Sequence, residues 1–414
     1  MGNKSFIRKL LVYITGSLAA QILSFMLMPI VTRTYSPESL GVINKFIAIA
    51  NIAIPLFTLS LVYSIVLTKS NLVSVIKVIC SNLIFFTIVA YVFIFFMWEW
   101  SSVAKHQVYW FLLPIYILSY SLTQIGEQIS VKYENFKKIS YANFLQSAVN
   151  NFFKLMLPLF FTPGYFLLIL SSIVGVASTF LLYTKDIFFF KIKKLFSYKR
   201  TLKVLQCNSN FVFFQTPQNI INALSQGFPV LIISALFGDN MAGQYGLANT
   251  LMLIPISLLG TAIINITYSK ITEIFKFGKN LSNYLIKFVL VMLCFSTVIF
   301  SPIFFWGDDL FSIFFGHEWK ISGELASFLV PSFIFILASR PVIPAIYIYK
   351  IQYYLLLNEI IGIVLRCAGL FAGYYYFQSA SISVLLFSLS NIIVYSLLCV
   401  QVLIKSRKLE HYKK

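Results

Sequence analysis

The chain has 414 residues, of which 59% are hydrophobic, 17% aromatic and 11% charged, and its formal net charge is +19. This composition excludes a water-soluble globular protein, because soluble domains carry about a quarter of charged residues. The positive charge alone would fit a nucleic-acid-binding protein, but the basic residues follow a membrane topology and no nucleic-acid-binding motif accompanies them.

Apolar runs of about 20 residues, each long enough to cross a hydrocarbon layer of about 30 Å, follow one another along the chain. Backbone groups in lipid must be hydrogen-bonded within their own segment, so these runs are predicted to be helices. The first run continues to about Val31 without a signal-peptide cleavage site, and we expect it to be retained. We predict twelve spans, over residues 9–31, 40–66, 76–98, 108–130, 141–162, 164–184, 208–236, 243–268, 284–306, 322–348, 353–376 and 380–404.

The loops between the predicted spans alternate in charge. Most of the 32 basic residues fall in one set of loops and at the two ends of the chain, whereas the opposite loops hold more acids than bases. The positive-inside rule therefore places both termini in the cytoplasm. An odd number of spans would break the alternation, which favours an even count.

A repeated pattern divides the predicted spans into two halves. Pro29 and Pro55 lie 26 residues apart around a polar turn, and Pro229 and Pro255 have the same spacing around a second one. The longest hydrophilic loop lies between the halves, and six spans in each half give both the same orientation, as in a parallel repeat. We therefore predict an N-terminal six-helix bundle over 1–190, a cytoplasmic linker over 191–207, a C-terminal six-helix bundle over 208–404 and a basic cytoplasmic tail over 405–414.

Charged residues within the predicted spans are the first candidates for a functional site. Each charge at the centre of a membrane helix costs roughly 2.5–3.5 kcal/mol, so a set of them indicates a function. The cations are Arg33, at the mouth of the first span, Lys45, Lys154, Arg340 and Arg366, and the acids are Glu127 and Glu359. The excess of cations fits a phosphate-bearing ligand. The alternatives for each residue are a salt bridge with a neighbour or a side chain that reaches the membrane surface.

Amide side chains recur at helical spacing in two of the predicted spans. They are Asn143, Gln146 and Asn150, on one helical face with Lys154, and Gln215, Asn219, Asn222 and Gln226. One such stripe would serve hydrogen bonding between helices. Polar stripes from both halves instead favour a water-filled chamber that binds hydroxyl-rich cargo.

Other kinds of chemistry lack their motifs in this sequence. No GxxxxGK[ST] loop is present, so ATP is not the expected energy source. The five cysteines have neither metal-ligand nor disulfide spacing, and there is no pairing of a nucleophile with a base. We expect no catalytic residue, no metal, no cofactor and no enzymatic activity.

Three stretches, MPIVTRTYSPESLGVI near the start, FGDNMAGQYGLANTLMLIPISLLGTAI in the middle and FFGHEWKISGELASFLVP late in the chain, carry a family resemblance. They resemble the O-antigen and polysaccharide flippases of the multidrug/oligosaccharidyl-lipid/polysaccharide exporter superfamily. The resemblance implies an all-α polytopic protein of the bacterial inner (plasma) membrane, with two pseudo-symmetric bundles forming a V. Such proteins move undecaprenyl-pyrophosphate-linked oligosaccharides to the outer leaflet by alternating access. The resemblance also implies that Arg33 and Lys45 face the cavity.

The predicted site follows from these observations together. We expect the five cations to bind the diphosphate and the seven amides to contact sugars, while Glu127 or Glu359 couples transport to a proton or sodium gradient unless a fixed salt bridge holds it. The expected partners are the lipid-linked oligosaccharide, membrane lipid, a polysaccharide polymerase and a chain-length regulator, without nucleic acid. The competing functions are a multidrug or cation antiporter, which would need an anionic chamber, and a membrane polysaccharide polymerase, which would need a large outward-facing loop.

Overall fold

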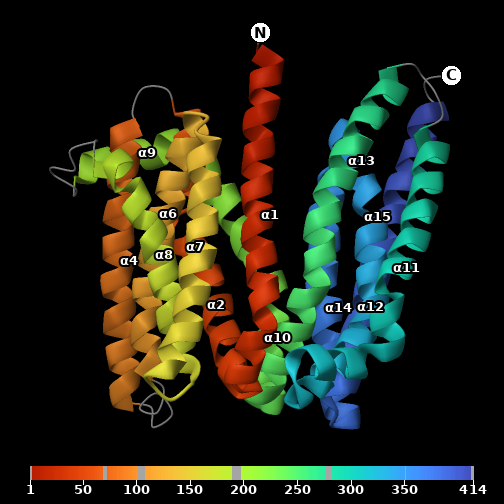
Figure 1. The fold of residues 1–414 in the computed structure, drawn as a ribbon. Helices are drawn as coiled ribbons and strands as arrows, with labels where there is room; N and C mark the ends of the chain where they lie inside the picture. The colour runs from red at the N-terminus through yellow and green to blue at the C-terminus, as the bar shows by residue number, and fades with distance from the viewer. Residues whose placement is uncertain are drawn as a thin grey trace. The chain divides into compact units, whose positions relative to one another are not determined.

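The computed structural model describes residues 2–68, 72–100, 108–188, 197–276, 281–349 and 351–411, and these residues form helices without any strand. The helices before the middle of the chain are α1 (Gly2–Thr34), α2 (Pro37–Thr58), α3 (Ser64–Leu67), α4 (Leu72–Trp100), α6 (Leu113–Lys132), α7 (Phe136–Met156), α8 (Tyr165–Phe188) and α9 (Tyr198–Cys207) (Figure 1). Those that follow are α10 (Thr216–Lys276), α11 (Leu281–Phe315), α12 (Lys320–Ala338), α13 (Ile343–Ile348), α14 (Tyr353–Phe377) and α15 (Ala380–His411).

Nine helical segments of the described residues are long and apolar enough to cross a membrane. The prediction of an all-α, multi-pass membrane protein is therefore confirmed. The predicted count of twelve spans is not matched one for one. The segment Phe211–Gly260 covers most of two predicted spans, and the more polar helices α6 and α7 are not among the nine.

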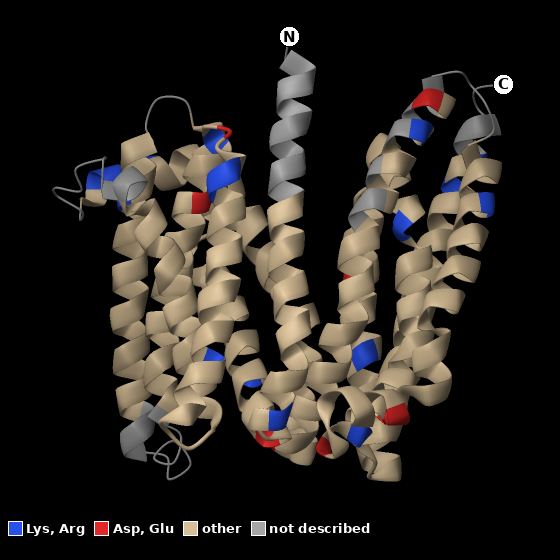
Figure 2. Cartoon of the chain, viewed as in Figure 1, with Lys and Arg blue, Asp and Glu red and all other residues tan. Residues whose placement is uncertain are grey.

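The chain divides into two compact units, residues 1–227 and 228–414. Unit 1 contains α1 to α9 and the start of α10, and unit 2 contains the rest of α10 and the later helices. Of the predicted linker, residues 191–196 lie outside the described residues, and α9 forms most of the remainder. Within each unit, charged residues lie mainly near the helix ends (Figure 2).

In unit 1 the first hairpin turns over the two residues between α1 and α2, Tyr35 and Ser36. Ser36 caps α2, because its side chain accepts a hydrogen bond from the backbone nitrogen of Ser39 at 3.3 Å, and Pro37 occupies the first helical position. The turn is therefore shorter than the sequence pattern predicts. Helix α7 packs against α1 and α8, and α6 also packs against α8.

In unit 2 the corresponding hairpin breaks at Gly238, inside α10. Gly238 has φ 88° and ψ 168°, a conformation that is essentially restricted to glycine, and no atom lies within 4 Å of where its β-carbon would be. Asp239 follows the break, and its carboxylate accepts a hydrogen bond from the hydroxyl of Ser234. The predicted turn at 237–242 is thus reduced to one backbone kink.

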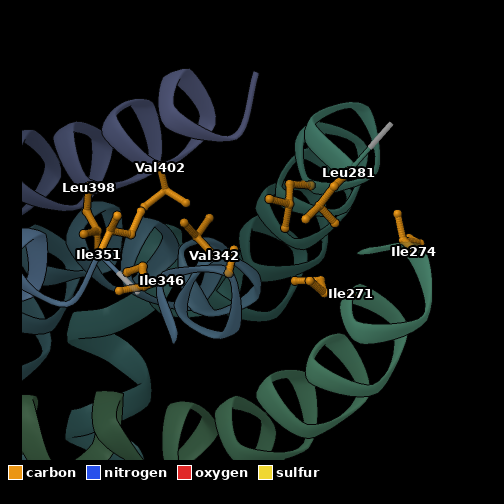
Figure 3. Close-up of a cluster of buried hydrophobic side chains, with 10 residues drawn as sticks. Ile271, Ile274, Leu281, Val342, Ile346, Ile351, Leu398 and Val402 are labelled. Carbon is orange, nitrogen blue, oxygen red and sulfur yellow. The ribbon is translucent and has the colours of Figure 1, made fainter. Parts of the chain in front are cut away.

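The hydrophobic core of unit 2 includes a cluster that joins the end of α10 to α11, α13 and α15. Its buried members are Ile271, Ile274, Leu281, Leu285, Val342, Ala345, Ile346, Ile351, Leu398 and Val402 (Figure 3). Elsewhere in the unit, α11 packs against α12, and α15 packs against α12 and α14. These contacts hold α14 and α15, which carry most of the polar residues described next for this unit.

Candidate functional site

In unit 1 the polar residues of α7 bond mainly to α1. The amide of Asn143 donates to the hydroxyl of Ser17 at 3.2 Å, and the amide of Asn151 donates to the hydroxyl of Ser24 at 3.0 Å. The hydroxyls of Ser24 and Ser147 lie 2.8 Å apart. Asn143 thus takes part in hydrogen bonding between helices α1 and α7, which is the alternative to a sugar contact that the sequence left open.

The other two amides predicted on α7 have different surroundings. The β-carbon of Asn150 lies beside Gly175 of α8, and its side-chain oxygen is buried without a hydrogen-bond partner among the described residues. Gln146 is half-buried. Asn143 faces α1 while Asn150 lies against α8, so the structure does not bring the predicted stripe to one shared surface.

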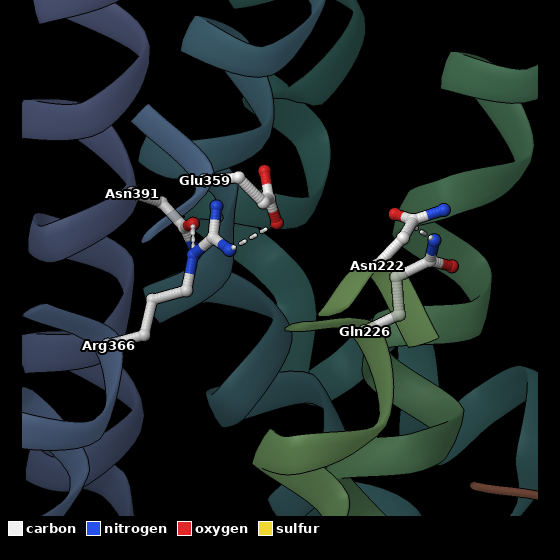
Figure 4. Close-up of polar contacts among 5 residues, drawn as sticks. All are labelled: Asn222, Gln226, Glu359, Arg366 and Asn391. Carbon is white, nitrogen blue, oxygen red and sulfur yellow. Dashed lines mark hydrogen bonds and ion pairs between the residues drawn. The ribbon is translucent and has the colours of Figure 1, made fainter. Parts of the chain in front are cut away.

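The amides at the start of α10 form two pairs with i to i+4 spacing. Gln215 donates to Asn219 at 3.0 Å, and Asn219 donates to the hydroxyl of Ser60 at 3.1 Å. Gln226 donates to Asn222 at 3.1 Å, and both of these side chains are exposed (Figure 4). The pair of Gln215 and Asn219 thus connects the start of α10 to the chain after α2. The pair of Asn222 and Gln226 instead exposes its amide groups on the surface of unit 1.

Ser60 lies in an unusual stretch of backbone. Both Leu59 and Ser60 have φ 49°, in the left-handed region that residues other than glycine seldom adopt. Their backbone N–H groups donate to the carbonyls of Leu56 and Pro55 and close the end of α2. The bond from Asn219 therefore reaches the chain within a stretch of strained backbone.

Three cations of the predicted diphosphate site belong to unit 1. Arg33, in the last turn of α1, is exposed, whereas Lys45 of α2 and Lys154 of α7 are half-buried. The hydroxyl of buried Tyr35 donates to the backbone carbonyl of Lys154 at 2.9 Å, which holds the last turn of α7 beside the turn that follows Arg33. Among the described residues, the ammonium group of Lys154 has neither an ion pair nor a hydrogen bond.

In unit 2 the predicted site residues of α14 lie against each other. The guanidinium of Arg366 donates from Nε to the amide oxygen of Asn391 at 2.7 Å and from Nη1 to the carboxylate of Glu359 at 3.3 Å (Figure 4). Arg366 is only 7% exposed. Tyr395, one turn after Asn391 on α15, lies beside the same guanidinium. Glu359 thus forms a salt bridge with Arg366. Such a salt bridge was the alternative to the predicted role of Glu359 in ion coupling.

Arg340 differs from Arg366 in having no carboxylate partner among the described residues. It begins the short 3-10 segment η6 (Arg340–Val342) after α12, and its side chain lies near Gly260 and Tyr395. Its Nε is buried and has no hydrogen-bond partner in the described part of the chain. This polar cluster contains two cations, Arg340 and Arg366, and one acid, Glu359, so it carries an excess positive charge. It also contains one buried donor without a partner among the described residues, the Nε of Arg340.

Glu127 of α6 has no ion pair within the described ranges, and its electrostatic neighbours are the hydroxyls of Tyr63 and Tyr120. The two acids predicted to couple transport therefore differ in their surroundings.

The described part of the chain contains no group of three or more His, Cys, Asp or Glu side chains able to hold a metal ion.

Several residues of these clusters were not predicted from the sequence. They are Ser17, Ser24, Tyr35, Ser60, Ser147, Asn151, Asn391 and Tyr395. Asn391 and Tyr395 have i to i+4 spacing in a span whose other polar residues are mainly serines, and that stripe was the available signal. The serines carry no comparable signal, because isolated hydroxyls are common in membrane helices.

Solved membrane transporters share this fold. The chain superposes on a lipid II flippase, MurJ, in an inward closed conformation, with a TM-score of 0.73, 13% identity and coverage of 97% of this chain and 92% of that one. It also superposes on an inward-facing multidrug resistance MATE family transporter of the MOP superfamily, with a TM-score of 0.69, 13% identity and coverage of 97% and 99%. A MATE transporter of Vibrio cholerae gives a TM-score of 0.58 at 10% identity, over 98% and 97% of the two chains.

At these identities the likeness concerns the fold, which is that of the MATE and MurJ transporters. The family is shown by sequence. The chain belongs to the polysaccharide biosynthesis protein family, whose model matches residues 30–323. No curated protein matches the chain.

Proposed function

We propose that the protein is a flippase that carries an undecaprenyl-pyrophosphate-linked oligosaccharide, a repeat unit of O-antigen or of a similar surface polysaccharide, across the bacterial inner membrane. The observation that carries the proposal is the excess of cations over acids inside the membrane helices of a chain from the polysaccharide biosynthesis family. Ammonium and guanidinium groups form their strongest hydrogen bonds with phosphate and carboxylate. A diphosphate is the anionic group that such a cargo would present.

In unit 1, Lys154 gives the proposal its strongest support. A cation inside a membrane helix is costly unless something compensates its charge, and no side chain in the described ranges does so for Lys154. The diphosphate of the cargo would supply that negative charge. Arg33 lies near the same end of the unit, because Tyr35 ties its turn to Lys154. Lys45 is the third cation that we assign to the diphosphate.

In unit 2, Arg340 is better placed than Arg366 to bind the diphosphate. The two bonds of Arg366 to Asn391 and Glu359 occupy two of its donors, whereas the buried Nε of Arg340 has none. A buried donor without a partner costs roughly 1–3 kcal/mol, which a phosphate oxygen would recover. Arg366 then contributes mainly its charge.

We assign the sugars to the amides, and first to Asn222 and Gln226, because both are exposed. A side-chain amide offers both donors and acceptors, which suits sugar hydroxyls. Gln146 and Asn150 follow, since Gln146 is half-buried and the oxygen of Asn150 is unpaired among the described residues. Asn143, Gln215 and Asn219 would need to exchange their present hydrogen bonds for sugar contacts.

The transport cycle would be alternating access, in which the two helix bundles expose the site to each side in turn. A proton or sodium gradient would drive it through Glu127, which has no ion pair among the described residues, rather than through Glu359, which has one.

By the positive-inside rule both termini would be cytoplasmic. A polysaccharide polymerase and a chain-length regulator would act on the cargo after transport, and the protein itself would catalyse no reaction.

A multidrug antiporter is the second candidate, because a multidrug resistance MATE transporter shares the fold. The two functions separate in a deletion strain. A flippase mutant accumulates the lipid-linked oligosaccharide on the inner leaflet, where a membrane-impermeant glycosidase added to intact spheroplasts does not reach it. Accumulation on the outer leaflet would indicate a polymerase, and normal surface polysaccharide with increased drug sensitivity would indicate an antiporter.

A further inference from the structure

Helix α9 (Tyr198–Cys207, sequence YKRTLKVLQC) has no part in the proposed transport site. It lies at the end of unit 1 where α4 begins, packs against α4, and runs across that helix end rather than along it (Figure 1). After three intervening residues the chain enters the π-helical segment η4 (Phe211–Gln215), which packs on η1 (Leu61–Tyr63). These contacts fix the position of α9 relative to the membrane helices of its unit.

The side chains of α9 divide into three faces. Val204 is buried on the face that meets α4. A second face carries Tyr198 and Leu202, which are 79% and 40% exposed and lie one turn apart, so that apolar surface is left without protein cover. A third face carries Lys199 and Lys203, which are both exposed and also lie one turn apart.

Such a helix, with an apolar face, a basic face and an orientation across a membrane helix, is typical of a segment that lies in the membrane surface. Helix α4 is long and apolar enough to span a membrane, and α9 lies at its end, the level at which such a span leaves the bilayer. An anionic lipid headgroup offers the complementary charge to the basic face. A segment surrounded by water would gain nothing from having Tyr198 and Leu202 on one exposed face.

Two other basic residues at the same end of the unit, Lys132 and Lys138, have contacts within the protein. The ammonium of Lys132 donates to the backbone carbonyls of Ile65 and Thr68 and closes the end of α3. The ammonium of Lys138 lies 5.2 Å from the centre of the Tyr183 ring. Lys199 and Lys203 have no such contact with the described residues, so their charges remain directed outward.

We propose that α9 is a membrane-surface helix that binds anionic phospholipid headgroups, with Tyr198 and Leu202 inserted at the acyl boundary and with Lys199 and Lys203 at the phosphates. This inference does not depend on the cargo of the transporter. It requires only that unit 1 spans a bilayer. The bound lipid belongs to the bulk bilayer and is not the transported molecule.

The depth of the helix can be measured on the full chain in nanodiscs. The five cysteines are replaced by serine, and a spin label is placed at Leu202→Cys or Lys199→Cys. The label at position 202 is expected to be more accessible to oxygen, and the label at 199 more accessible to a water-soluble nickel complex. Equal exposure of both labels to the nickel complex would place α9 in water and overturn the proposal.

The headgroup preference needs a second measurement with a matched control. Spin-labelled phosphatidylglycerol and phosphatidylcholine are compared for association with the wild-type protein, with K199Q/K203Q and with K137Q/K138Q, which removes the same charge from the start of α7 at the same end of unit 1. The α9 variant is expected to lose the preference for phosphatidylglycerol, by about fivefold for each neutralised side chain. An equal loss in the control variant, or no preference in the wild type, contradicts a lipid site on α9.

Discussion

Arg366 and Glu359, two turns apart on α14, form an ion pair of 3.3 Å in which the side chain of the arginine is 9% and that of the glutamate 35% exposed. The pair is completed from α15, where Asn391 accepts from Nε of the arginine. A cation that would be costly alone in a membrane helix is thereby compensated inside unit 2.

Removing either partner of this pair should destabilise the protein, and removing both should not add the two losses. We expect Glu359→Gln to lower the free energy of unfolding by about 1–3 kcal/mol, since it leaves Arg366 without its carboxylate. The double variant E359Q/R366Q should recover part of that loss, a coupling measured by thermal unfolding of the purified protein. Strictly additive effects would mean that the pair is not energetically coupled.

Lys154 should matter for transport rather than for folding. We expect Lys154→Gln to abolish surface polysaccharide while the protein remains in the membrane at normal levels, because the diphosphate loses a charge partner. Lys154→Arg, which keeps the charge, should retain part of the activity. Lys270→Gln is a suitable control, since Lys270 is exposed and paired with Glu273 at 2.8 Å. Polysaccharide would be assayed by gel electrophoresis, and a normal ladder in K154Q would remove this residue from the mechanism.

Gly238 should be required for its backbone conformation alone. We expect Gly238→Ala to destabilise the protein by about 1–3 kcal/mol, because an alanine is strained at φ 88° and ψ 168°. Gly164 offers a matched control, since its β-carbon would likewise have no atom within 4 Å but its φ is not positive. The melting temperature of G164A should stay at the wild-type value, and equal stability of both variants would argue against strain at the kink.

The stretch at Leu59 and Ser60 allows strain and hydrogen bonding to be separated. Ser60→Ala removes the acceptor of the Asn219 amide and keeps the left-handed conformation, whereas Ser60→Gly removes the acceptor and relieves the conformation. S60G is therefore expected to be more stable than S60A by about 1 kcal/mol, as judged from thermal unfolding. If S60A proved the more stable of the two, the backbone there would not be strained.

Much of the fold could be predicted from composition and from the spacing of prolines. The apolar runs require helices, and Pro37 after Ser36 marks the start of α2 because proline favours the first helical turn. The length of the turns was less predictable. A two-residue turn capped by Ser36, and one glycine with positive φ, suffice where the sequence indicated longer polar turns.

The partners of the polar residues were the least predictable part. Asn143 and Asn150 share a helical stripe in the sequence, but α7 lies between α1 and α8, and the two amides meet different helices. Arg366 finds Asn391 on another helix, 25 residues away. Periodicity identifies the face of a helix, and only the packing of helices decides whether that face meets a neighbour, lipid or a ligand.

The proposed function requires that the excess membrane cations bind a lipid-linked diphosphate. The most direct test measures binding of undecaprenyl pyrophosphate, and of the uncharged alcohol undecaprenol, to the full chain in phosphatidylcholine nanodiscs, for the wild type and for K154Q/R340Q. We expect the wild type to bind the pyrophosphate more tightly than the alcohol and the double variant to lose this difference. Equal binding of the two lipids by the wild type would contradict it.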